Sequence, residues 1–381
     1  MKDITYRLYG VIFKIAKLFP VKYHKVVIYM IHNSNFNDNL KFVYDEMKRR
    51  DPSFRFIVIS KKDLFHPQGD NKAYKFLKKI YGVFYFYIIL NYHFASAEYI
   101  LLNDNFLPLA YMPLKKATKL IQLWHGAGAF KRFGLSTEEK ESVRNMVQKG
   151  NAQVHALFVT SKNVVPYYEE ALGVIKDNIY PVGLPATDYY YKIEEHKDVI
   201  MNLRNLYPSI KHKKVILYAP TFRNSEEENN KILSKFDCER MVKELGDEYI
   251  ILIRMHPQIR PESRNIQAPC IDVTDYKDVK ELYVLSDLLI TDYSSVVVEY
   301  ALLKKPMIFY AYDLEQYDRG FYDSYEELVP GKIVKDMDQL VHAISEIEKQ
   351  ENNQKHDEFL KKQYDYFDGN STKRVVDVIL E

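Results

Sequence analysis

LLITDYSSVVVEYALL, at residues 288–303, is the stretch that decides the fold. Its first four residues form an apolar run typical of a buried parallel strand, and the part from Val296 onward has the pattern of a helix. Between them, a turn carries hydroxyl and carboxylate side chains. A strand, a polar turn and a helix in this order form the unit of a parallel α/β sheet, and free N–H groups at a helix start attract phosphate. The stretch therefore predicts an α/β protein that binds a phosphorylated ligand.

Apolar runs alternate with helical patterns on both sides of this stretch, which predicts two parallel sheets. The expected strands of the first sheet are Val26–Ile31, Phe54–Ser60, Tyr99–Asn103, Lys119–Leu123, Ala156–Thr160 and Ile179–Pro181. Those of the second are Lys214–Ala219, Tyr249–Arg254, Ile271–Val273, Leu288–Thr291, Pro306–Phe309 and Ile333–Val334. A chain of 381 residues also exceeds what one core usually supports. We expect one domain at 1–195, a second at 196–365, and a last helix, roughly 357–381, whose residues 366–381 return to the first domain.

The composition is that of an ordinary globular protein and excludes few functions. The chain has 54 Lys and Arg against 52 Asp and Glu, so its charge does not favour nucleic-acid binding, and any anion site must be local. The two cysteines, Cys238 and Cys270, lack metal-ligand spacing and offer at most one disulfide. A reduced, cytosolic protein is the simpler interpretation.

Two apolar stretches in the first hundred residues are candidates for membrane contact. Residues 6–26, YRLYGVIFKIAKLFPVKYHKV, are basic and amphipathic, which is typical of a segment that lies on an anionic membrane surface. The alternative is a helix packed on the first domain. The run from Ile80 to Phe94 is too short to cross a bilayer, so we expect a buried helix there. No cleavable signal is expected.

Polar side chains follow four of the expected strands at the point where each strand ends. Ligands of open parallel sheets bind outside the carboxyl ends of the strands, so these side chains are candidates for one ligand site. They are His125 and Gly126 after Leu123, Thr221 and Arg223 after Ala219, His256 after Arg254, and Asp292, Ser294 and Ser295 after Thr291.

Two histidines are the candidates for chemistry. His125 is the first choice for a general base, because histidine titrates near neutral pH and Gly126 and Gly128 relax its loop. His256, close to Arg254, is expected to donate to a phosphoryl oxygen. The alternative for each is a histidine that only orders its loop. The sequence contains no HExxH, Cys/His cluster or Walker A motif, so we expect no metal site and no ATP hydrolysis.

Other polar residues are candidates for ligand contacts. Ser294 and Ser295 lack the G-x-S-x-G context of a hydrolase nucleophile and fit phosphate ligands better, although a serine N-cap needs no ligand. In the loop after the next strand, Arg319 is a candidate phosphate clamp, and Glu327 or its neighbour Glu326 is a candidate for polyol hydroxyls; the alternative is a solvated loop. A polar loop near the N-terminus is assigned to acceptor contacts, through Asn37, Asp38 and Asn39.

Short motifs run through nearly the whole chain in order. They are NDN at 37–39, NDNFLP at 103–108, LWHGAGAFKRFG at 123–134, GLPATD at 183–188, ILYAPTFR at 216–223, RMHP at 254–257, LLITDYSSVVVEYALLKKP at 288–306, the loop 310–331, and FDGNST at 367–372. Each is short, but their order and spacing together make a specific signal. The chain resembles the CDP-glycerol glycerophosphotransferase family of teichoic acid synthesis, which includes CDP-ribitol-using members.

The resemblance implies a GT-B-like enzyme with two Rossmann-type domains facing across a cleft, and with no metal or other cofactor. Its reaction moves glycerol phosphate from CDP-glycerol to a hydroxyl of an undecaprenyl-diphosphate disaccharide, releasing CMP. The family's required histidines correspond to His125 and His256, and its pyrophosphate-binding elements to Thr291, Ser294, Ser295 and Arg319. Many members have an arginine where this chain has Ala186, so no role of that arginine carries over.

The resemblance also implies an acceptor and a subcellular location. Polymer-forming members generally carry an additional N-terminal region, and this chain is similar to the primase-type members, which add one or a few units. A lipid-linked acceptor implies peripheral attachment to anionic lipid at the cytoplasmic face of the membrane. Three alternatives stay open: CDP-ribitol or multi-unit transfer within the family, a GT-B glycosyltransferase with a UDP-sugar, and a non-catalytic protein that binds nucleotide or lipid. The sequence does not indicate the oligomeric state.

Overall fold

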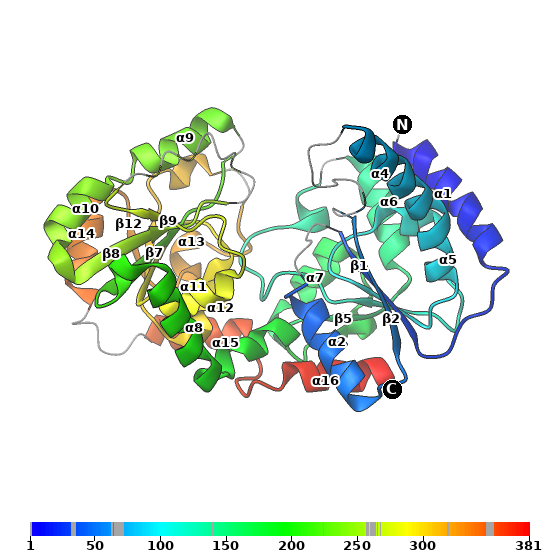
Figure 1. Cartoon of the computed structure of the whole chain (residues 1–381). Helices are drawn as coiled ribbons and strands as arrows, with labels where there is room; N and C mark the ends of the chain where they lie inside the picture. Colours follow the sequence, from blue (N-terminus) through cyan, green and yellow to red (C-terminus); the bar gives the residue numbers. More distant parts are fainter. Residues whose placement is uncertain are drawn as a thin grey trace. The chain divides into compact units, whose positions relative to one another are not determined.

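The computed structural model of the chain forms two compact units (Figure 1). It describes residues 2–31, 36–61, 64, 72–138, 140–223, 225–256, 259, 264, 266, 268–317, 320–347 and 354–381. Unit 1 comprises Met1–Gly128, Arg132–Asp188 and Tyr364–Glu381, and unit 2 comprises Ala129–Lys131 and Tyr189–Gln363. The change at residue 188 comes before the expected boundary at 195, because helix α8 (Ile193–Leu206) packs on a helix of unit 2.

Unit 1 is built on a parallel sheet. Its strand order among the described residues is β2-β1-β3-β4-β5-β6, and each neighbouring pair is parallel. The strands are β1 (Lys25–Met30), β2 (Arg55–Ser60), β3 (Tyr99–Leu102), β4 (Lys119–Gln122), β5 (Val154–Phe158) and β6 (Ile179–Tyr180). The central strand β1 is buried along its whole length, as expected for a sheet covered on both faces. The six strands expected in this half are confirmed to within two residues.

Unit 2 contains the second parallel sheet, in the order β12-β11-β10-β7-β8-β9. The strands are β7 (Lys214–Ala219), β8 (Tyr249–Ile253), β9 (Ile271–Asp272), β10 (Leu288–Thr291), β11 (Met307–Tyr310) and β12 (Lys332–Val334). Counted from the first strand of the unit, this is the order 3-2-1-4-5-6 of the Rossmann fold. The strand LLIT that opens the deciding stretch is the fourth strand, and its prediction is confirmed.

Each sheet has one place where the chain reverses the direction in which strands are added. In unit 1 this switch lies between β1 and β3, and in unit 2 it lies between β7 and β10. The loops that leave neighbouring strands at such a switch run to opposite faces of the sheet and open a crevice. The segments after β1 and β3, and those after β7 and β10, are therefore the places to look for ligand-binding groups.

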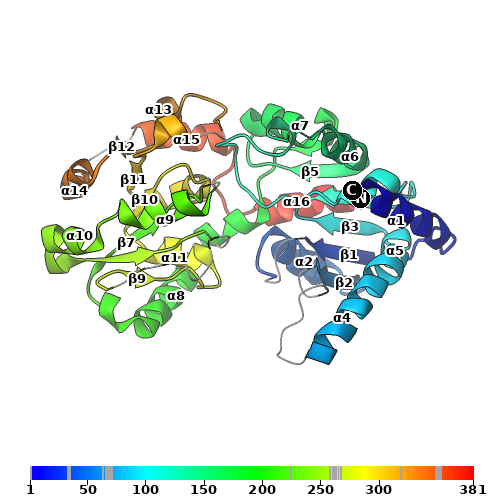
Figure 2. The ribbon, with the colours of Figure 1, turned by 90° about the horizontal axis from the view of Figure 1, so that it is seen from above.

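Helices cover both faces of the sheets (Figures 1 and 2). In unit 1 they are α1 (Lys2–Ala16), α2 (Asn39–Arg50), α4 (Lys72–Phe84), α5 (Leu90–Ala95), α6 (Glu141–Asn151), α7 (Val165–Leu172) and α16 (Ser371–Leu380). In unit 2 they are α8, α9 (Glu226–Ser234), α10 (Cys238–Leu245), α11 (Val279–Leu285), α12 (Val296–Tyr300), α13 (Tyr325–Leu328), α14 (Met337–Ser345) and α15 (Gln354–Gln363).

The expected single helix over 357–381 is wrong, because two helices occupy this region. Helix α15 ends at Gln363 in unit 2, and α16 begins at Ser371 in unit 1. Gly369 between them has a φ of 64°, which a continuing helix does not allow. The carboxylate of Asp188 accepts hydrogen bonds from the backbone N–H groups of Ser371 and Thr372, each at 2.8 Å, and so holds the start of α16.

The apolar run at 80–94 differs in part from the expected buried helix. It belongs to a continuous helical segment made of α4, a π-helical turn at Tyr85–Ile89, and α5. Phe86, Leu90 and Phe94 are buried as expected, but Ile80 and Phe84 are about half exposed. Among the described residues, no helix is both long and apolar enough to span a membrane.

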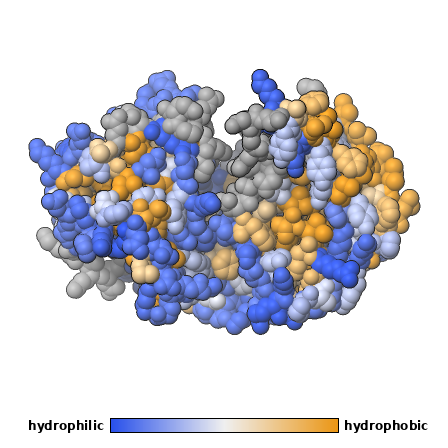
Figure 3. Space-filling model, viewed as in Figure 1, coloured by the Kyte–Doolittle hydropathy of each residue, from blue (hydrophilic) through white to orange (hydrophobic). Residues whose placement is uncertain are grey.

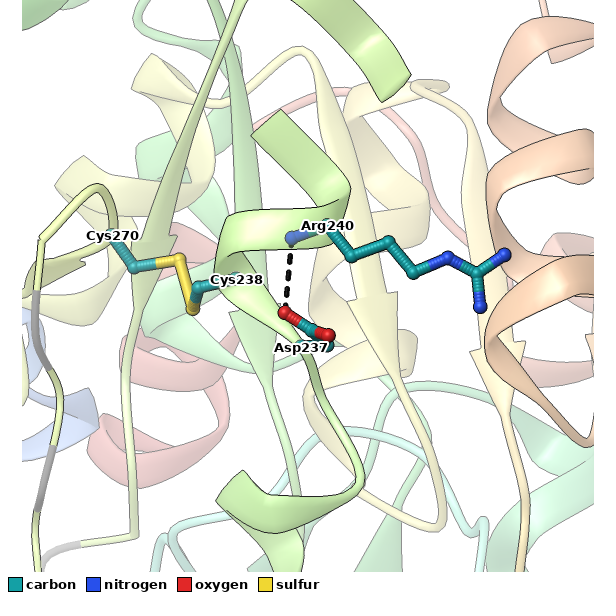
Figure 4. Close-up of a disulfide and its surroundings, with 4 residues drawn as sticks. All are labelled: Asp237, Cys238, Arg240 and Cys270. Atoms are coloured by element: carbon teal, nitrogen blue, oxygen red, sulfur yellow. Dashed lines mark hydrogen bonds between the residues drawn. A yellow bond between two sulfur atoms is a disulfide. The ribbon is translucent and has the colours of Figure 1, made fainter. Parts of the chain in front are cut away.

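A disulfide joins the two cysteines in unit 2 (Figure 4). Cys238 is the first residue of α10, whose N-cap Asp237 accepts a hydrogen bond from the N–H of Arg240, and Cys270 immediately precedes β9. Their Cα atoms are 6.0 Å apart, within the usual range for a disulfide. The expectation of two reduced thiols is therefore wrong for this structure, since only the fold brings together cysteines separated by 32 positions.

Candidate active site

His125 lies on the loop that follows β4, at the carboxyl end of this inner strand of the unit 1 sheet. Trp124, one residue earlier, has a φ of 48° and is buried, whereas the side chain of His125 is 50% exposed. The Nδ1 atom of His125 lies 3.0 Å from the backbone oxygen of Asn103. A carbonyl only accepts hydrogen bonds, so Nδ1 carries a proton and the neutral ring keeps its lone pair on Nε2. This is the tautomer that a general base acting through Nε2 requires.

Two further groups orient the imidazole of His125. The Asp104 carboxylate lies 3.8 Å from Nδ1, on the side of the ring that the Asn103 carbonyl also faces. The buried indole of Trp124 stacks on the imidazole, with ring centroids 4.4 Å apart. We assigned no role to Asn103 or Asp104 from the sequence, although both lie in the quoted NDNFLP motif.

The residues assigned to acceptor contacts hold this loop in place. The Asn39 amide donates to the backbone oxygens of Leu123 and Trp124, each at 3.2 Å, and accepts from the N–H of Ala186 at 2.8 Å. Asp38 caps α2 and accepts from the Asn103 amide at 2.8 Å. Asn39 is only 3% exposed, so the fold uses its side chain to position the loop that carries His125. Asn37 lies one residue before the cap, in the same loop.

The glycines after His125 allow a tight path for the chain. The hydroxyl of Tyr168 donates to the backbone oxygens of Gly126 and Gly128, at 2.8 and 3.0 Å. Gly128 has a φ of 60°, and its N–H donates to Thr160 Oγ1. The loop is therefore tied to helix α7 and to the end of β5, which limits how far His125 can move.

Arg223 is the centre of a buried network at the switch of unit 2. Its guanidinium donates to Asp292 at 2.9 Å and to both carboxylate oxygens of Asp313, at 2.7 and 2.9 Å, and it also donates to the backbone oxygen of Thr221. Burial lowers the pKa of Arg223, but the two carboxylates outweigh burial and raise it above the ordinary value. The network joins the loops that follow β7, β10 and β11.

Tyrosines enclose the Arg223 guanidinium. Its central carbon lies 5.0 Å from the ring centroid of Tyr293 and 5.9 Å from that of Tyr317. The Tyr293 hydroxyl donates to Asp313 at 2.8 Å, and burial together with that carboxylate raises the Tyr293 pKa above its ordinary value. The side chain of Arg223 is 7% exposed, so its charge pairs with the carboxylates of the loops and holds these loops together. Sequence reasoning identified Arg223 but missed Asp313 and the tyrosines.

Three more of the assigned donor residues lie at the same switch. Thr291 is fully buried and its hydroxyl donates to the backbone oxygen of Ala219 at 2.7 Å. Asp292 is 1% exposed and accepts from the N–H groups of Thr221 and Tyr293. The Thr221 hydroxyl is different, since it is buried with no hydrogen-bond partner among the described residues. Such an unpaired group costs free energy that a bound ligand can recover.

The two serines of the deciding stretch stand at the start of α12. Ser295 is exposed at the N-cap, and its side chain makes no capping hydrogen bond. Ser294 is partly exposed, and its hydroxyl lies 3.5 Å from the N–H of Val296. These are the most accessible polar groups of the turn, whereas Thr291 and Asp292 face the interior.

His256 lies three residues after the end of β8, which neighbours β7 in the unit 2 sheet. Its ring is partly exposed and contacts Phe222, with ring centroids 4.5 Å apart. Arg254, two residues before His256, donates to the backbone oxygens of Val273 and Tyr276. Burial lowers the pKa of Arg254.

Two assigned donor residues remain. Glu327 is exposed on α13 and lines a surface pocket of about 590 Å³ with Lys355 and Lys362, and no other residue of the assigned donor set lines that pocket. The assignment of Glu327 to donor contacts stays a prediction. Arg319 lies outside the described residues.

The structure thus gathers the assigned residues into two groups, each within one unit. Asn37, Asp38, Asn39, His125 and Gly126 surround the switch of unit 1, and Thr221, Arg223, Thr291, Asp292, Ser294 and Ser295 surround the switch of unit 2. In the part of the chain that the structure describes, no group of three or more His, Cys, Asp or Glu side chains is arranged to hold a metal ion.

Two Rossmann-type units with polar groups at their switch points define a GT-B-like α/β enzyme class. The family model for CDP-glycerol:poly(glycerophosphate) glycerophosphotransferase matches residues 11–381, and the chain belongs to that family. The expected family and fold class are both confirmed. The family comprises CDP-alcohol phosphotransferases of teichoic acid synthesis.

The relatives include enzymes for both polyols. The chain is 35% identical to the teichoic acid ribitol-phosphate primase of Bacillus spizizenii, over 98% of this chain and 95% of the primase. It is 34% identical to the poly(ribitol-phosphate) polymerase of the same species, but spans only 60% of that polymerase's length. The glycerol-phosphate primase of Bacillus subtilis is 34% identical, over 75% of this chain and 76% of that primase.

Solved structures agree on the fold. The wall teichoic acid polymerase TagF, as its H444N variant soaked with CDPG, matches with a TM-score of 0.79 and 26% identity, over 100% of this chain and 95% of that one. The UDP-GlcNAc 2-epimerase of Neisseria meningitidis matches with a TM-score of 0.57 and 12% identity, over 93% of this chain and 99% of that one, a likeness of fold alone.

Proposed function

We propose that this protein transfers glycerol phosphate from CDP-glycerol to a hydroxyl of a lipid-linked disaccharide acceptor, releasing CMP. The observation that carries the proposal is the hydrogen bond from His125 Nδ1 to the Asn103 carbonyl, which leaves Nε2 able to accept a proton. The acceptor hydroxyl loses its proton to Nε2 while its oxygen bonds to the phosphorus that bears glycerol. The bond from that phosphorus to the oxygen of CMP breaks, and CMP leaves with the electron pair.

The donor is assigned to the switch of unit 2. The unpaired hydroxyl of Thr221 and the accessible hydroxyls of Ser294 and Ser295 support contacts to the pyrophosphate, where positioned donors stabilise developing charge. His256 and Arg319 are assigned to the same oxygens by the family resemblance. Arg223 and Asp292 are proposed to act indirectly, by fixing the loops that present these hydroxyls.

CDP-ribitol is the second candidate donor. The ribitol-phosphate primase of Bacillus spizizenii is 35% identical over nearly the full length of both chains. This similarity supports CDP-ribitol at least as strongly as the similarity to the glycerol-phosphate primase supports CDP-glycerol. The same proposal includes the addition of one or a few units. It also includes the acceptor, an undecaprenyl-diphosphate disaccharide at the cytoplasmic face of the membrane.

A donor comparison tests the function. The purified protein is incubated with CDP-glycerol, CDP-ribitol or UDP-GlcNAc and a short-chain prenyl-diphosphate disaccharide, and nucleotide release and product mass are measured. We expect CMP release and an acceptor heavier by one or a few glycerol phosphates. A larger rate with CDP-ribitol would assign the second donor, and UDP release would assign a glycosyltransferase. Binding of CDP-glycerol without release, with an acceptor that a related primase accepts, would assign a binding protein.

A further inference from the structure

The loop that carries His125 contributes residues to both units. Residues 129–131 belong to unit 2, whereas Gly128 before them and Arg132 after them belong to unit 1. We call residues 129–131 the strap. The rest of unit 2 begins only at Tyr189, so the strap is far from it in the sequence. Specific contacts must therefore hold the strap in unit 2.

The side chain of Gln363 holds the first residue of the strap. The N–H of Ala129 donates to Gln363 Oε1 at 2.8 Å, and the amide nitrogen of Gln363 donates to the backbone oxygen of Ala129 at 3.3 Å. Gln363 is the last residue of α15 and is fully buried, and Ala129 is 4% exposed. Without this amide both backbone groups would be buried and unpaired, which is unfavourable. The pair of hydrogen bonds therefore fixes the strap to the end of α15.

The other two residues of the strap contact Phe321. Lys131 forms an isolated antiparallel bridge with Phe321, and the ring of Phe130 lies 5.7 Å from that of Phe321. The Phe130 side chain is 2% exposed. The Phe321 ring in turn lies 6.1 Å from that of Tyr293, which encloses the Arg223 guanidinium. Ring contacts therefore connect the strap to the polar network at the switch of unit 2.

Unit 1 holds the same loop immediately before and after the strap. The N–H of Gly128 donates to Thr160 Oγ1 at 3.1 Å. On the other side, the ring of Phe133 lies 5.5 Å from that of Trp124. The loop is thus bonded to unit 1 and to unit 2 at adjacent positions of the chain. The place of His125 therefore depends on the anchors in unit 2 as well as on those in unit 1.

We propose that Gln363 and Phe321 are positioning residues, which hold the strap so that His125 stays where a general base must be. The inference deepens the proposed function and rests on it. Gln363 and Phe321 touch no substrate in this proposal and act only through the backbone of residues 129–131. A general base must lie within hydrogen-bond reach of its proton, so a shift of about 1 Å is enough to lower turnover by about 10²-fold.

Gln363→Met tests the positioning role. Methionine is unbranched like glutamine and suits a buried site, but it pairs with neither backbone group of Ala129. With a short-chain soluble acceptor, we expect Q363M to lower kcat by about tenfold or more. The KM for CDP-glycerol and its calorimetric Kd should stay within about twofold, because the donor-binding groups are unchanged. F130L removes the ring contact with Phe321, should lower kcat in the same way, and keeps the test available if Q363M does not fold.

Gln153 provides a matched control. Its side chain accepts from the N–H of Leu114 at 2.8 Å and donates to the backbone oxygen of Leu109 at 3.0 Å, within unit 1. Q153M therefore removes the same kind of hydrogen-bond pair away from His125, and we expect it to keep full kcat. Full kcat in both Q363M and F130L overturns the proposal. An equal fall of kcat in Q153M and Q363M also overturns it, because the loss would then be a general effect of destabilisation.

Trp124 reports the state of the His125 loop without turnover. It is the single tryptophan of the sequence, is 7% exposed, and stacks on His125. Loss of the strap anchor should let the loop open. We therefore expect acrylamide to quench the Trp124 emission roughly threefold more efficiently in Q363M than in Q153M or the original protein. Equal quenching in all three proteins overturns the proposal.

Association between molecules has to be excluded in the quenching measurement. Figure 3 shows hydrophobic side chains gathered over the region where Figure 1 draws α1, α4 and α5. Association through an apolar surface of unit 1 would shield this unit from acrylamide. Quenching is therefore measured at concentrations where sedimentation velocity gives the same single species for every variant.

The failure of this inference is separable from the failure of the proposed function, because quenching requires neither donor nor acceptor. Stronger quenching in Q363M, together with no nucleotide release from any donor by the original protein, would refute the transferase and leave the strap as the anchor of the His125 loop. Turnover by the original protein, with equal kcat and equal quenching in Q363M, would refute the positioning role alone.

Discussion

At the scale of single residues, hydrogen-bond partners divide the assigned site into groups that face a ligand and groups that hold the fold. His125 has one ring nitrogen bound to a carbonyl and a half-exposed side chain, which suits a proton acceptor. Arg223 was also predicted to contact the ligand, but it forms ion pairs with two carboxylates and is 7% exposed. Both residues follow the end of a strand and were candidates for the ligand site, and their hydrogen-bond partners indicate which of them faces a ligand and which holds the loops.

Replacing His125 with alanine is expected to lower turnover by about 10²–10⁴-fold, the usual contribution of a general base. Stability should change little, because the ring is half exposed. The measurement is CMP release together with the thermal unfolding midpoint. His155 on β5 is an exposed histidine of the same unit, and H155A is the control expected to keep full activity. Turnover of H125A within threefold of the control would remove His125 as the base.

Thr221→Val is expected to stabilise the free protein and weaken donor binding. The buried Oγ1 has no partner, so replacing it with a methyl group removes a desolvation cost of about 1–2 kcal/mol. The stabilisation that saturating CDP-glycerol gives should then shrink, because the hydroxyl is assigned to the pyrophosphate. Urea unfolding with and without CDP-glycerol measures both effects. A valine variant that is less stable than the original would show that Thr221 has a structural partner.

Arg223→Leu is expected to destabilise the protein by about 3–5 kcal/mol, because the buried Asp292 and the partly buried Asp313 would be left without a cation. Arg223→Lys restores the charge but not the forked geometry, and should recover only part of that loss. Urea unfolding of both variants gives the comparison. If lysine restored full stability, the bidentate contact with Asp313 would not matter.

Part of the site could be predicted from the sequence, because it depends on residues that directly follow the strands in the chain. His125, the serines and the strand-end positions follow from chain order, since parallel strands end at one edge of a sheet. Asp313 and Asn103 were missed because their partners lie 90 and 22 positions away along the chain, at Arg223 and His125.

At the scale of elements, strands followed the sequence more faithfully than helices did. A strand buried on both faces must be apolar throughout, and every expected strand is present within two residues. The sequence pattern of a helix that contacts both core and solvent does not show which of its faces is buried. The apolar side chains of α4, for example, are exposed. The break between α15 and α16 depends on Gly369, whose positive φ is decided by packing.

Helix α2 provides a test of pH dependence. Hydrogen bonding to Arg49 lowers the pKa of Glu46 to about 2, against the opposing effect of burial, and Arg50 contributes further while also binding Asp377 of α16. A carboxylate with a depressed pKa stabilises the fold above its unfolded pKa of about 4.5, and this stability is lost as pH falls toward 2.

Glu46→Gln should therefore cost about 1–3 kcal/mol at pH 7, and the difference from the original protein should vanish near pH 2. Urea unfolding across this range is the measurement. Glu98, whose side chain bonds the N–H of His24 instead of an arginine, offers a control carboxylate in the same unit. A difference that stays constant from pH 7 to pH 2 would contradict the assigned ion pairs.

At the scale of the whole molecule, the disulfide is a constraint across unit 2. It closes a segment that includes β8 and His256, with 32 positions between its cysteines. Closing a loop of this length is expected to contribute roughly 3–4 kcal/mol by restricting the unfolded chain. On the cytoplasmic face proposed above, a reducing environment would keep the same two residues as thiols, so we expect the unit to fold with or without the bond.

C238S/C270S is therefore expected to unfold at lower urea than the oxidised protein and at the same urea as the protein treated with dithiothreitol. Mass spectrometry after alkylation reports the oxidation state in each sample. Equal stability of the oxidised and reduced proteins would mean that the bond does not restrain the unfolded chain.

The return of the last helix to unit 1 has a consequence for genetics. Gly183, with a φ of 101°, lets the chain pass so close to Ser371 that a Cβ atom there would lie 2.3 Å from the serine Oγ. Residues 364–381 therefore fold with residues 1–128 and 132–188, while one uninterrupted stretch, 189–363, makes nearly all of unit 2. A stop codon before residue 364 is thus expected to damage unit 1 although unit 1 is built mostly from earlier residues, and exchange of unit 2 between family members by recombination needs two crossovers rather than one.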